Sequence, residues 1–307
     1  MIDGVLRSQS HLTGRDMTLL GWLADHGVLT SFQIAHALYP SVNFAQRRLR
    51  KLVALGVIDR FRPQRPDGGS HPYHYVLSQL GVEVVAGQRG EDLPRKDQAK
   101  TRRWHLTNRA NLPHLLGTNE FFIQLAGHAR THPGAALRRW WPTTRCIKLG
   151  AFADSDHFDP TIFGYTPRIR PDGHGVWTDG ERTVPFFVEF DSGTEPLWKV
   201  AGKLTGYAHL AKVTGKVWPV LLWLHSARRE HNLREHLTRE HPAAVVAATA
   251  ARDHAALLGL SPAEAVWALA GPNTNGDRLR LADLPHITPR PHLLTGTPTE
   301  QRPAEPA

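Results

Sequence analysis

The first part of the chain repeats apolar residues with the period of amphipathic helices. Thr13 stands where an N-cap is expected, and Asp16 three residues later completes a capping box. The apolar positions that follow stop at Gly27, a C-terminal helix signal. Thr30 and Ser31 are both suited to cap the next helix. This pattern predicts three helices, over residues 13–26, 32–38 and 42–55.

After Gly56 the period changes to the alternation of strands. Residues 57–62 and 73–77 alternate apolar and polar side chains, and the segment between them is rich in Gly and Pro. Three helices followed by a two-stranded hairpin predict a winged helix-turn-helix domain over residues 10–87. A small helical domain whose arginines form a solvated face is the alternative at this stage.

In a winged helix-turn-helix, the third helix enters the major groove and the hairpin reaches phosphates. The third helix carries a dense polar and basic surface. The candidate DNA-binding residues are Gln46, Arg47, Arg48, Arg50 and Lys51 on this helix and Arg60, Arg62 and Arg65 on the hairpin.

The charge of the chain is concentrated in the same region. Lys and Arg number 37 against 28 Asp and Glu, a formal net charge of +9. Residues 1–105 carry 15 basic and 9 acidic residues, so two thirds of the excess lies in this first third. A basic balance favours an anionic partner such as nucleic acid, although a merely basic protein has the same composition. Residues 88–105 have no apolar period and end in a basic run, which predicts a linker, plain and flexible or lying along DNA.

Beyond the linker, strand and helix patterns alternate. This order predicts a second domain over residues 106–285, an α/β unit around a mixed sheet. The Pro- and Thr-rich residues 286–307 predict a disordered tail. The main predicted elements are helices over 112–130 and 227–239 and strands over 137–141, 183–191, 216–225, 244–248 and 266–269.

Three acidic residues mark the end of one of these strands. Glu189 and Asp191 are two residues apart, so they point to the same side of the strand. Asp172 is expected at the end of the preceding strand and lies beside them if the two strands pair as a hairpin. Converging carboxylates are what a hard cation such as Mg²⁺ requires, and such an ion activates water for attack on a phosphodiester.

The next helix supplies basic partners for these acids. Glu195, Lys199, Lys203 and Tyr207 recur every four residues and share one helix face. A lysine from this face would orient the water or stabilise the transition state. An exposed Glu–Lys ladder on a surface helix is the alternative.

Several other chemistries are disfavoured. A single cysteine, Cys146, excludes an intramolecular disulfide framework and a Cys-based zinc site. His231, His236 and His241 are five residues apart, unlike a helical zinc pair, and no Gly-rich phosphate loop with a lysine is present. The chain has no apolar run of membrane-spanning length, and MIDGVLRSQS lacks the core of a signal peptide. We therefore expect a soluble, cytoplasmic protein.

Five segments together resemble a known family. They are LTGRDMTLLGWLADHGVLTSFQIAHAL, RRLRKLVALGVIDR, HLLGTNEFF, RPDG and PFFVEFDSGTEPLWKVAGKLTGY. Their order resembles the replication-relaxation family of actinobacterial plasmids and integrative elements, over about residues 12–270. The resemblance implies a DNA-associated protein of mobile-element replication or transfer.

The second domain resembles the PD-(D/E)XK nuclease fold. On this resemblance Asp172 is the acid of the PD motif and Glu189 the second acid, and both would bind Mg²⁺. Asp191 stands where that superfamily usually has its lysine, so Lys203 is the candidate for a lysine relocated to the adjacent helix. Glu120 resembles the accessory acid on the first helix of the domain.

Two functions therefore remain open. One is a double-stranded DNA-binding protein of plasmid or mobile-element replication or DNA relaxation that also nicks DNA with Mg²⁺. The other is a non-catalytic DNA-binding regulator or replication accessory, in which the second domain mediates homodimerisation or contact with other replication proteins.

Overall fold

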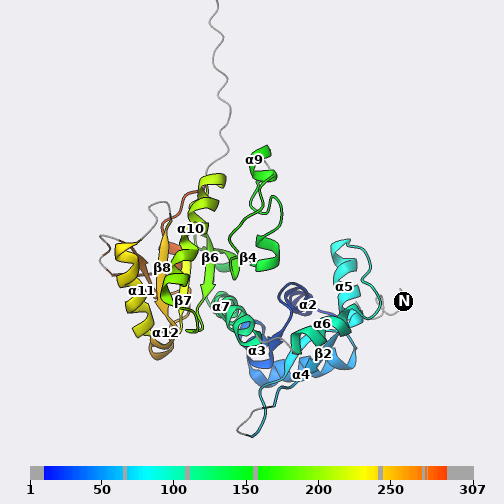
Figure 1. Cartoon of the computed structure of the whole chain (residues 1–307). Coiled ribbons are helices and arrows are strands. Elements are labelled where there is room, and N and C mark those ends of the chain that lie inside the picture. Colours follow the sequence, from blue (N-terminus) through cyan, green and yellow to red (C-terminus); the bar gives the residue numbers. More distant parts are fainter. Residues whose placement is uncertain are drawn as a thin grey trace, which may run out of the picture.

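The computed structural model describes residues 10–64, 68–107, 111–154, 158–240, 245–271, 274 and 276–288. Its N-terminal part contains the three predicted helices and the predicted hairpin (Figure 1). Thr13 and Asp16 form the predicted capping box, and Thr30 caps the second helix. The elements are α2 (Gly14–His26), β1 (Leu29–Thr30), α3 (Ser31–Leu38), α4 (Val42–Ala54), β2 (Ile58–Phe61) and β3 (His74–Leu77).

A short strand joins the hairpin to the helices. β1 pairs antiparallel with β3, which also pairs with β2, so the small sheet has the order β1-β3-β2. The sequence pattern did not predict β1, because two residues are too few to show a period. The tip of the hairpin, including Arg65, lies outside the described residues.

The predicted linker is partly helical. After α5 (Gln79–Arg89), which was also not predicted, α6 spans Gln98–Thr107. Arg103 of α6 pairs with Asp59 at 2.8 Å, and Arg102 donates to the Ala24 carbonyl at 2.6 Å. The prediction of a segment without regular structure is therefore wrong for α6. Only Ala99 and Leu106 of this helix are buried. Because two apolar positions are too few to show a helical period, the sequence pattern did not reveal the helix.

The C-terminal part is built on a seven-stranded mixed sheet. The strand order is β10-β9-β8-β7-β6-β5-β4, with β6, β7 and β8 parallel and the outer neighbours antiparallel. The elements are α7 (Leu112–Thr131), β4 (Ala135–Pro142), α8 (Thr143–Cys146), α9 (Pro160–Phe163), β5 (Gly173–Asp179), β6 (Arg182–Phe190), α10 (Leu197–Thr214), β7 (Val220–Leu224), α11 (Ala227–Arg239), β8 (Ala247–Ala251), α12 (Arg252–Leu258), β9 (Trp267–Ala270), β10 (Arg278–Leu279) and the 3₁₀ turn η1 (Leu281–Asp283).

Two predictions about this part need correction. The strand beside β6 does not end at Asp172 but begins directly after it, because β5 starts at Gly173 and pairs with Val188. The predicted tail starts too early, since Ile287 forms a β-bridge with Val217 and Trp218 donates to Thr288 at 2.9 Å. The rest of the predicted tail, 289–307, lies outside the described residues.

Helices cover both faces of the large sheet. Alternate residues of β6 divide between two cores: Phe186 and Val188 join the core that contains α7, whereas Phe187 joins the core with α10 and α11. Glu189 therefore points towards α10 and Phe190 towards α7. Among the described residues, no helix is long and apolar enough to cross a membrane.

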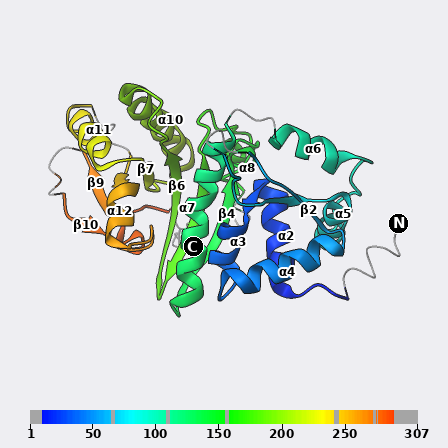
Figure 2. The ribbon, with the colours of Figure 1, turned by 90° about the horizontal axis from the view of Figure 1, so that it is seen from below.

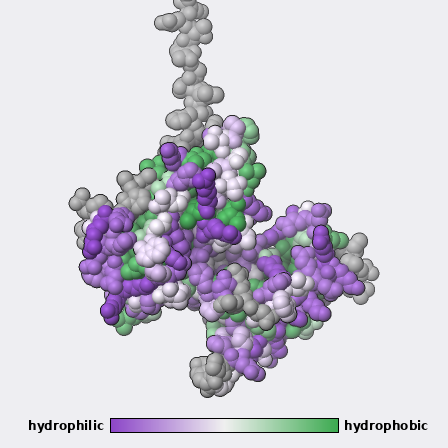
Figure 3. Space-filling view, viewed as in Figure 1, coloured by the Kyte–Doolittle hydropathy of each residue, from purple (hydrophilic) through white to green (hydrophobic). Residues whose placement is uncertain are grey.

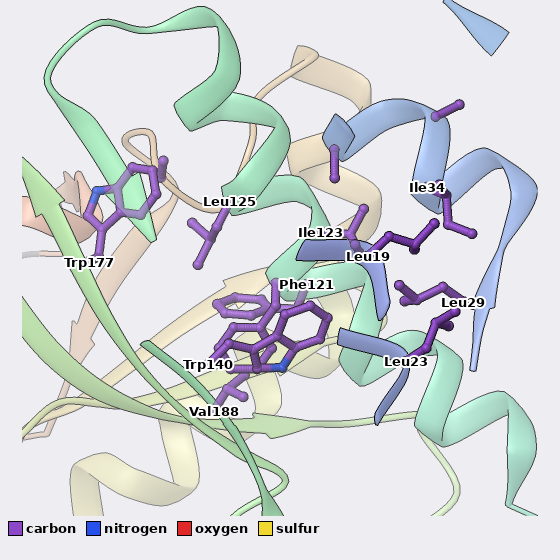
Figure 4. Close-up of a cluster of buried hydrophobic side chains, with 14 of the residues drawn as sticks. Leu19, Leu23, Leu29, Ile34, Phe121, Ile123, Leu125, Trp140, Trp177 and Val188 are labelled. Carbon is purple, nitrogen blue, oxygen red and sulfur yellow. The ribbon is translucent and has the colours of Figure 1, made fainter. Parts of the chain in front are cut away.

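Helix α7 is shared between the two parts of the molecule. It lies between α3 and the strands of the large sheet (Figure 2). Its Phe122 stacks on Trp140 with ring centres 5.1 Å apart, while Ile123 lies towards Leu19 of the N-terminal helices (Figure 4). A side chain at Gly127 would meet the His36 ring at 2.2 Å, so only glycine lets α7 approach α3 this closely. One continuous core therefore links both parts.

Candidate functional site

Helix α4 presents a basic surface to solvent. Ser41 caps it, and its buried residues Ala45, Leu49 and Leu52 hold one side against the N-terminal core. The opposite side is exposed, in agreement with the polar and basic surface predicted for this helix. Its exposed residues include Gln46, Arg47, Arg50 and Lys51.

Arg48 differs from its neighbours because it faces inward. Its guanidinium donates to both oxygens of Asp16, at 2.9 and 2.5 Å, and to the His11 carbonyl at 2.8 Å. Asp16 is completely buried. Burial raises the pKa of Asp16, but hydrogen bonds from Arg48 and Thr13 outweigh burial and lower it. Arg48 thus joins α4 to α2, a role that the basic pattern did not reveal.

The hairpin arginines enclose an aromatic ring. The guanidinium groups of Arg60 and Arg62 lie 4.2 and 4.9 Å from the centre of the Tyr73 ring. Arg62 also donates to the His71 carbonyl at 2.7 Å. Both arginines are exposed, so the ring orders their stems while their charges face solvent.

A second cluster forms around Glu189, which is 2% exposed. Lys203 of α10 donates to Glu189 Oε2 at 2.8 Å, and Tyr207, one turn further along α10, donates to Oε1. Lys203 is one-third exposed and also lies 3.4 Å from Glu195. The spacing of four residues along α10 therefore brings Lys203 and Tyr207 to one carboxylate.

Asp172 joins this cluster from the segment before β5. Its Oδ2 accepts from the backbone N–H of Phe190 at 2.9 Å, directly beside Glu189. Its Oδ1 lies 2.9 Å from His114 Nε2 near the start of α7. The site thus contains His114, which the sequence analysis placed on a helix but did not assign. A histidine 58 positions from its partner carries no local signal of that contact.

The charges in the cluster shift one another. Burial, and then the nearby charge of Asp172, raise the pKa of Glu189 to about 7. Burial lowers the pKa of Lys203, but Glu189 and Asp172 outweigh it, so the pKa of Lys203 is raised. Burial and Glu189 also raise the pKa of Tyr207. The hydrogen bond to Asp172 also raises the pKa of His114, so Lys203 and His114 are the basic partners of the two acids.

Other predicted members of the site lie elsewhere. Asp191 faces the same layer as Glu189, but Arg229 of α11 holds both of its oxygens, at 2.5 and 2.9 Å. Glu120 accepts a hydrogen bond from Gln124 at 3.4 Å and lines a separate cavity beside Phe190. Of these two residues of α7, His114 therefore contacts the cluster, whereas Glu120 bonds to Gln124.

Asp172 and Glu189 are the two acids that remain as candidate ligands for Mg²⁺. They offer hard oxygen donors, and one or two carboxylates commonly suffice for Mg²⁺ at phosphate-handling sites. Within the described ranges, no group of three or more His, Cys, Asp or Glu side chains is placed to hold a metal ion. A two-carboxylate site completed by water and phosphate fits these residues.

A comparison with protein families gives one match, to the model described as replication-relaxation, over residues 20–221. The match covers more than half of the chain. The chain belongs to the replication-relaxation family. A comparison with curated proteins and one with solved structures found no match.

The region matched to the replication-relaxation family includes both candidate sites. It begins in α2 and ends in β7, so it contains the exposed face of α4 and the cluster of Asp172, Glu189 and Lys203. Family membership points to a role in replication or relaxation of plasmid or mobile-element DNA.

Proposed function

We propose that this replication-relaxation protein binds double-stranded DNA of a plasmid or mobile element through a winged helix-turn-helix and nicks it with Mg²⁺ at a PD-(D/E)XK site. The first part rests on α4, whose exposed Gln46, Arg47 and Arg50 project away from the N-terminal core. These side-chain types hydrogen-bond base edges in the major groove. Arg60 and Arg62, ordered by Tyr73, contact the flanking phosphates.

The order of elements supports the nuclease part. A helix (α7), three antiparallel strands (β4, β5, β6), a second helix (α10) and a parallel strand (β7) follow one another along the chain and lie side by side. This arrangement resembles that of the PD-(D/E)XK core, which supports the proposal. Asp172 precedes the second of these strands and Glu189 lies in the third, which are the positions of the two motif acids.

The observation that carries the catalytic proposal is the position of Lys203. Its Nζ lies 2.8 Å from Glu189 Oε2, although it comes from α10 and not from the strand. The usual lysine position holds Asp191, which is committed to Arg229. This contact supports the proposal that Lys203 serves as the motif lysine from the neighbouring helix.

Each residue then has a defined role. Asp172 and Glu189 would hold the ion, and His114 orients the Asp172 carboxylate. Lys203 is placed to hold the attacking water or a phosphate oxygen, since it is one-third exposed. Bound Mg²⁺ would supply a Lewis acid that activates water and neutralises charge on the phosphodiester.

One observation favours a non-catalytic second candidate, a DNA-binding regulator or replication accessory. All four oxygens of the two acids already accept hydrogen bonds within the protein, from His114, the Phe190 amide, Lys203 and Tyr207. In such a protein the cluster stabilises the fold, and the second domain serves in contact with another copy or with other replication proteins.

Incubation with supercoiled plasmid and Mg²⁺ separates the two candidates. The nuclease predicts relaxed plasmid from the parent protein and a loss of at least about 100-fold in rate for Asp172→Ala, Glu189→Ala and Lys203→Ala. Glu235→Ala removes an exposed acid of α11 and serves as the control with unchanged rate. No product across divalent metals and cognate plasmids, or nicking that survives both acid substitutions, contradicts the nuclease and leaves the accessory function.

A further inference from the structure

A large cavity adjoins Asp172 and His114. It has a volume of about 990 Å³ and lies where α6, the beginning of α7 and the end of β4 approach the segment before β5. The surface is recessed between the upper and right-hand parts of the molecule (Figure 3). Asp172 and His114 are part of its wall, so the cavity leads to the cluster described above.

The cavity is lined by basic side chains from both parts of the chain. Arg95 and Lys96 line it from the segment before α6, and Arg170 lines it from the segment before β5. All three are exposed, and none of them forms an ion pair with an acid of the described residues. Arg102 adds a fourth cation, anchored by its bond to the Ala24 carbonyl.

The two acidic residues that line the cavity, Asp25 and Asp172, do not neutralise the charge of these cations. Asp25 is held by Arg89 through two bonds of 2.9 Å, and Asp172 is bonded to His114 and the Phe190 amide. The cavity therefore offers several cations to an anionic ligand, next to the cluster for which we propose phosphodiester chemistry. A chain of phosphates satisfies such a row of cations better than a single anion.

Aromatic rings accompany the cations. Trp140 lines the cavity with His26 stacked on it at 3.6 Å, and His105 lines it from α6. The ring of Trp104, which is 63% exposed, lies 5.1 Å from that of His105. Cationic grooves with exposed aromatic rings bind single strands, because phosphates follow the cations while bases stack.

The size of the cavity excludes a duplex. A volume of 990 Å³ equals a cube with edges of about 10 Å, which is narrower than a double helix, so a duplex cannot enter it. A few unpaired nucleotides fit in such a space. Duplex binding is already assigned to α4, which lies outside this cavity.

We propose that the cavity binds a short segment of single-stranded DNA and brings one of its phosphates to Asp172. Arg95, Lys96 and Arg170 contact the backbone, and the ring of His105 receives a base. The choice of DNA as the nucleic acid and the chemistry at Asp172 rest on the proposed function. The affinity of the cavity for a single strand does not depend on that function.

The test uses the full chain and a fluorescein-labelled octathymidylate, with binding followed by anisotropy. Arg95→Ala combined with Arg170→Ala removes one exposed cation from each wall. We expect the affinity to fall at least about 10-fold and the salt dependence, log K against log salt, to flatten by about 1.4, since each phosphate contact with a single strand contributes about 0.7. Lys212→Ala combined with Arg228→Ala removes two exposed cations from α10 and α11, and should change the affinity less than about 2-fold.

Three outcomes overturn the inference. The parent protein does not bind octathymidylate; both double variants lose affinity equally; or the cavity variant loses duplex affinity in parallel with single-strand affinity, which makes the cavity part of the duplex surface. Failure of the proposed function gives a different pattern. A protein that binds no duplex or nicks no plasmid, yet binds octathymidylate through Arg95 and Arg170, retains the cavity as a single-strand site.

Discussion

Lys203 Nζ lies 2.8 Å from Glu189 Oε2, and the two residues come from neighbouring elements, α10 and β6. Glu189 is almost completely buried, whereas Lys203 is one-third exposed. The ammonium group therefore neutralises a carboxylate that could not otherwise stay ionised inside the protein. It also reaches solvent, where a substrate phosphate would arrive.

Lys203→Met should destabilise the protein. Removal of one partner of a fully buried ion pair costs about 3–5 kcal/mol, and partial exposure of Lys203 reduces the expected loss to about 1–3 kcal/mol. Lys199→Met, one turn earlier on the same helix, removes an exposed lysine and should cost less than about 0.5 kcal/mol. Urea unfolding of both variants measures the difference, and equal losses would contradict the role of the pair.

Arg48→Ala should destabilise the N-terminal part by about 3 kcal/mol. The substitution leaves Asp16 buried without its cation, which is the costly case for a charged group. Arg47→Ala on the same helix is the control and should be neutral within about 0.5 kcal/mol. Thermal melting of the two variants distinguishes a structural arginine from a surface one, and a stable Arg48→Ala protein would show that Asp16 does not need it.

Arg47→Ala combined with Arg50→Ala should weaken duplex binding without unfolding the protein. Each phosphate contact with duplex DNA contributes about 0.9 to the salt dependence, so loss of two contacts lowers the slope by about 1.8. If either residue contacts a base instead, discrimination between sequences falls and the slope changes less. Titration of labelled duplex at several salt concentrations measures both. Unchanged affinity would exclude α4 as the DNA-contacting helix.

Acidic pH should weaken the contact between the two parts of the molecule. Burial lowers the pKa of His26 to about 3, below its ordinary 6.5, so folded His26 stays neutral while the unfolded chain takes up a proton below pH 6.5. The stability that neutral His26 contributes is fully present above pH 6.5 and is lost as the pH falls. The loss reaches about 2 kcal/mol at pH 5.

His26→Phe keeps the stacking on Trp140 and removes the proton-binding group. We expect the free energy of unfolding of this variant to fall about 2 kcal/mol less than that of the parent protein between pH 7 and pH 5. His231→Gln, at an exposed histidine of α11, is the control and should follow the parent. A pH dependence identical in His26→Phe and the parent would show that His26 is not held neutral.

Two glycines of α5 should respond oppositely to alanine. A Cβ at Gly81 would lie 1.9 Å from the Val57 carbonyl oxygen, so Gly81→Ala must displace the helix from the hairpin and should cost several kcal/mol. Gly87, in the same helix, has open space around it, and Gly87→Ala should stabilise the protein by about 0.5–1 kcal/mol. Melting temperatures that move in the same direction would contradict the packing of α5.

Local features were accessible to prediction because the backbone imposes them. The capping box of Thr13 and Asp16, the exposed side of α4 and the alternation along β6 follow from helical and strand periods. Helices α5 and α6 were not predicted because their own residues show no clear apolar period. Gly81 and Gly87 interrupt the first, and the second has two buried residues, so both depend on packing rather than on their own pattern.

The sequence by itself determined the basic helix, the strand that ends in acids, and the helical spacing of Lys203 and Tyr207. Tertiary structure alone decided which of these residues meet. Arg48 turns to Asp16, 32 positions away, and His114 to Asp172, 58 positions away. The physical reason is that periodicity is set by hydrogen bonds between near neighbours in the chain. Contacts between distant residues form only when buried apolar faces pack and bring their helices and strands together.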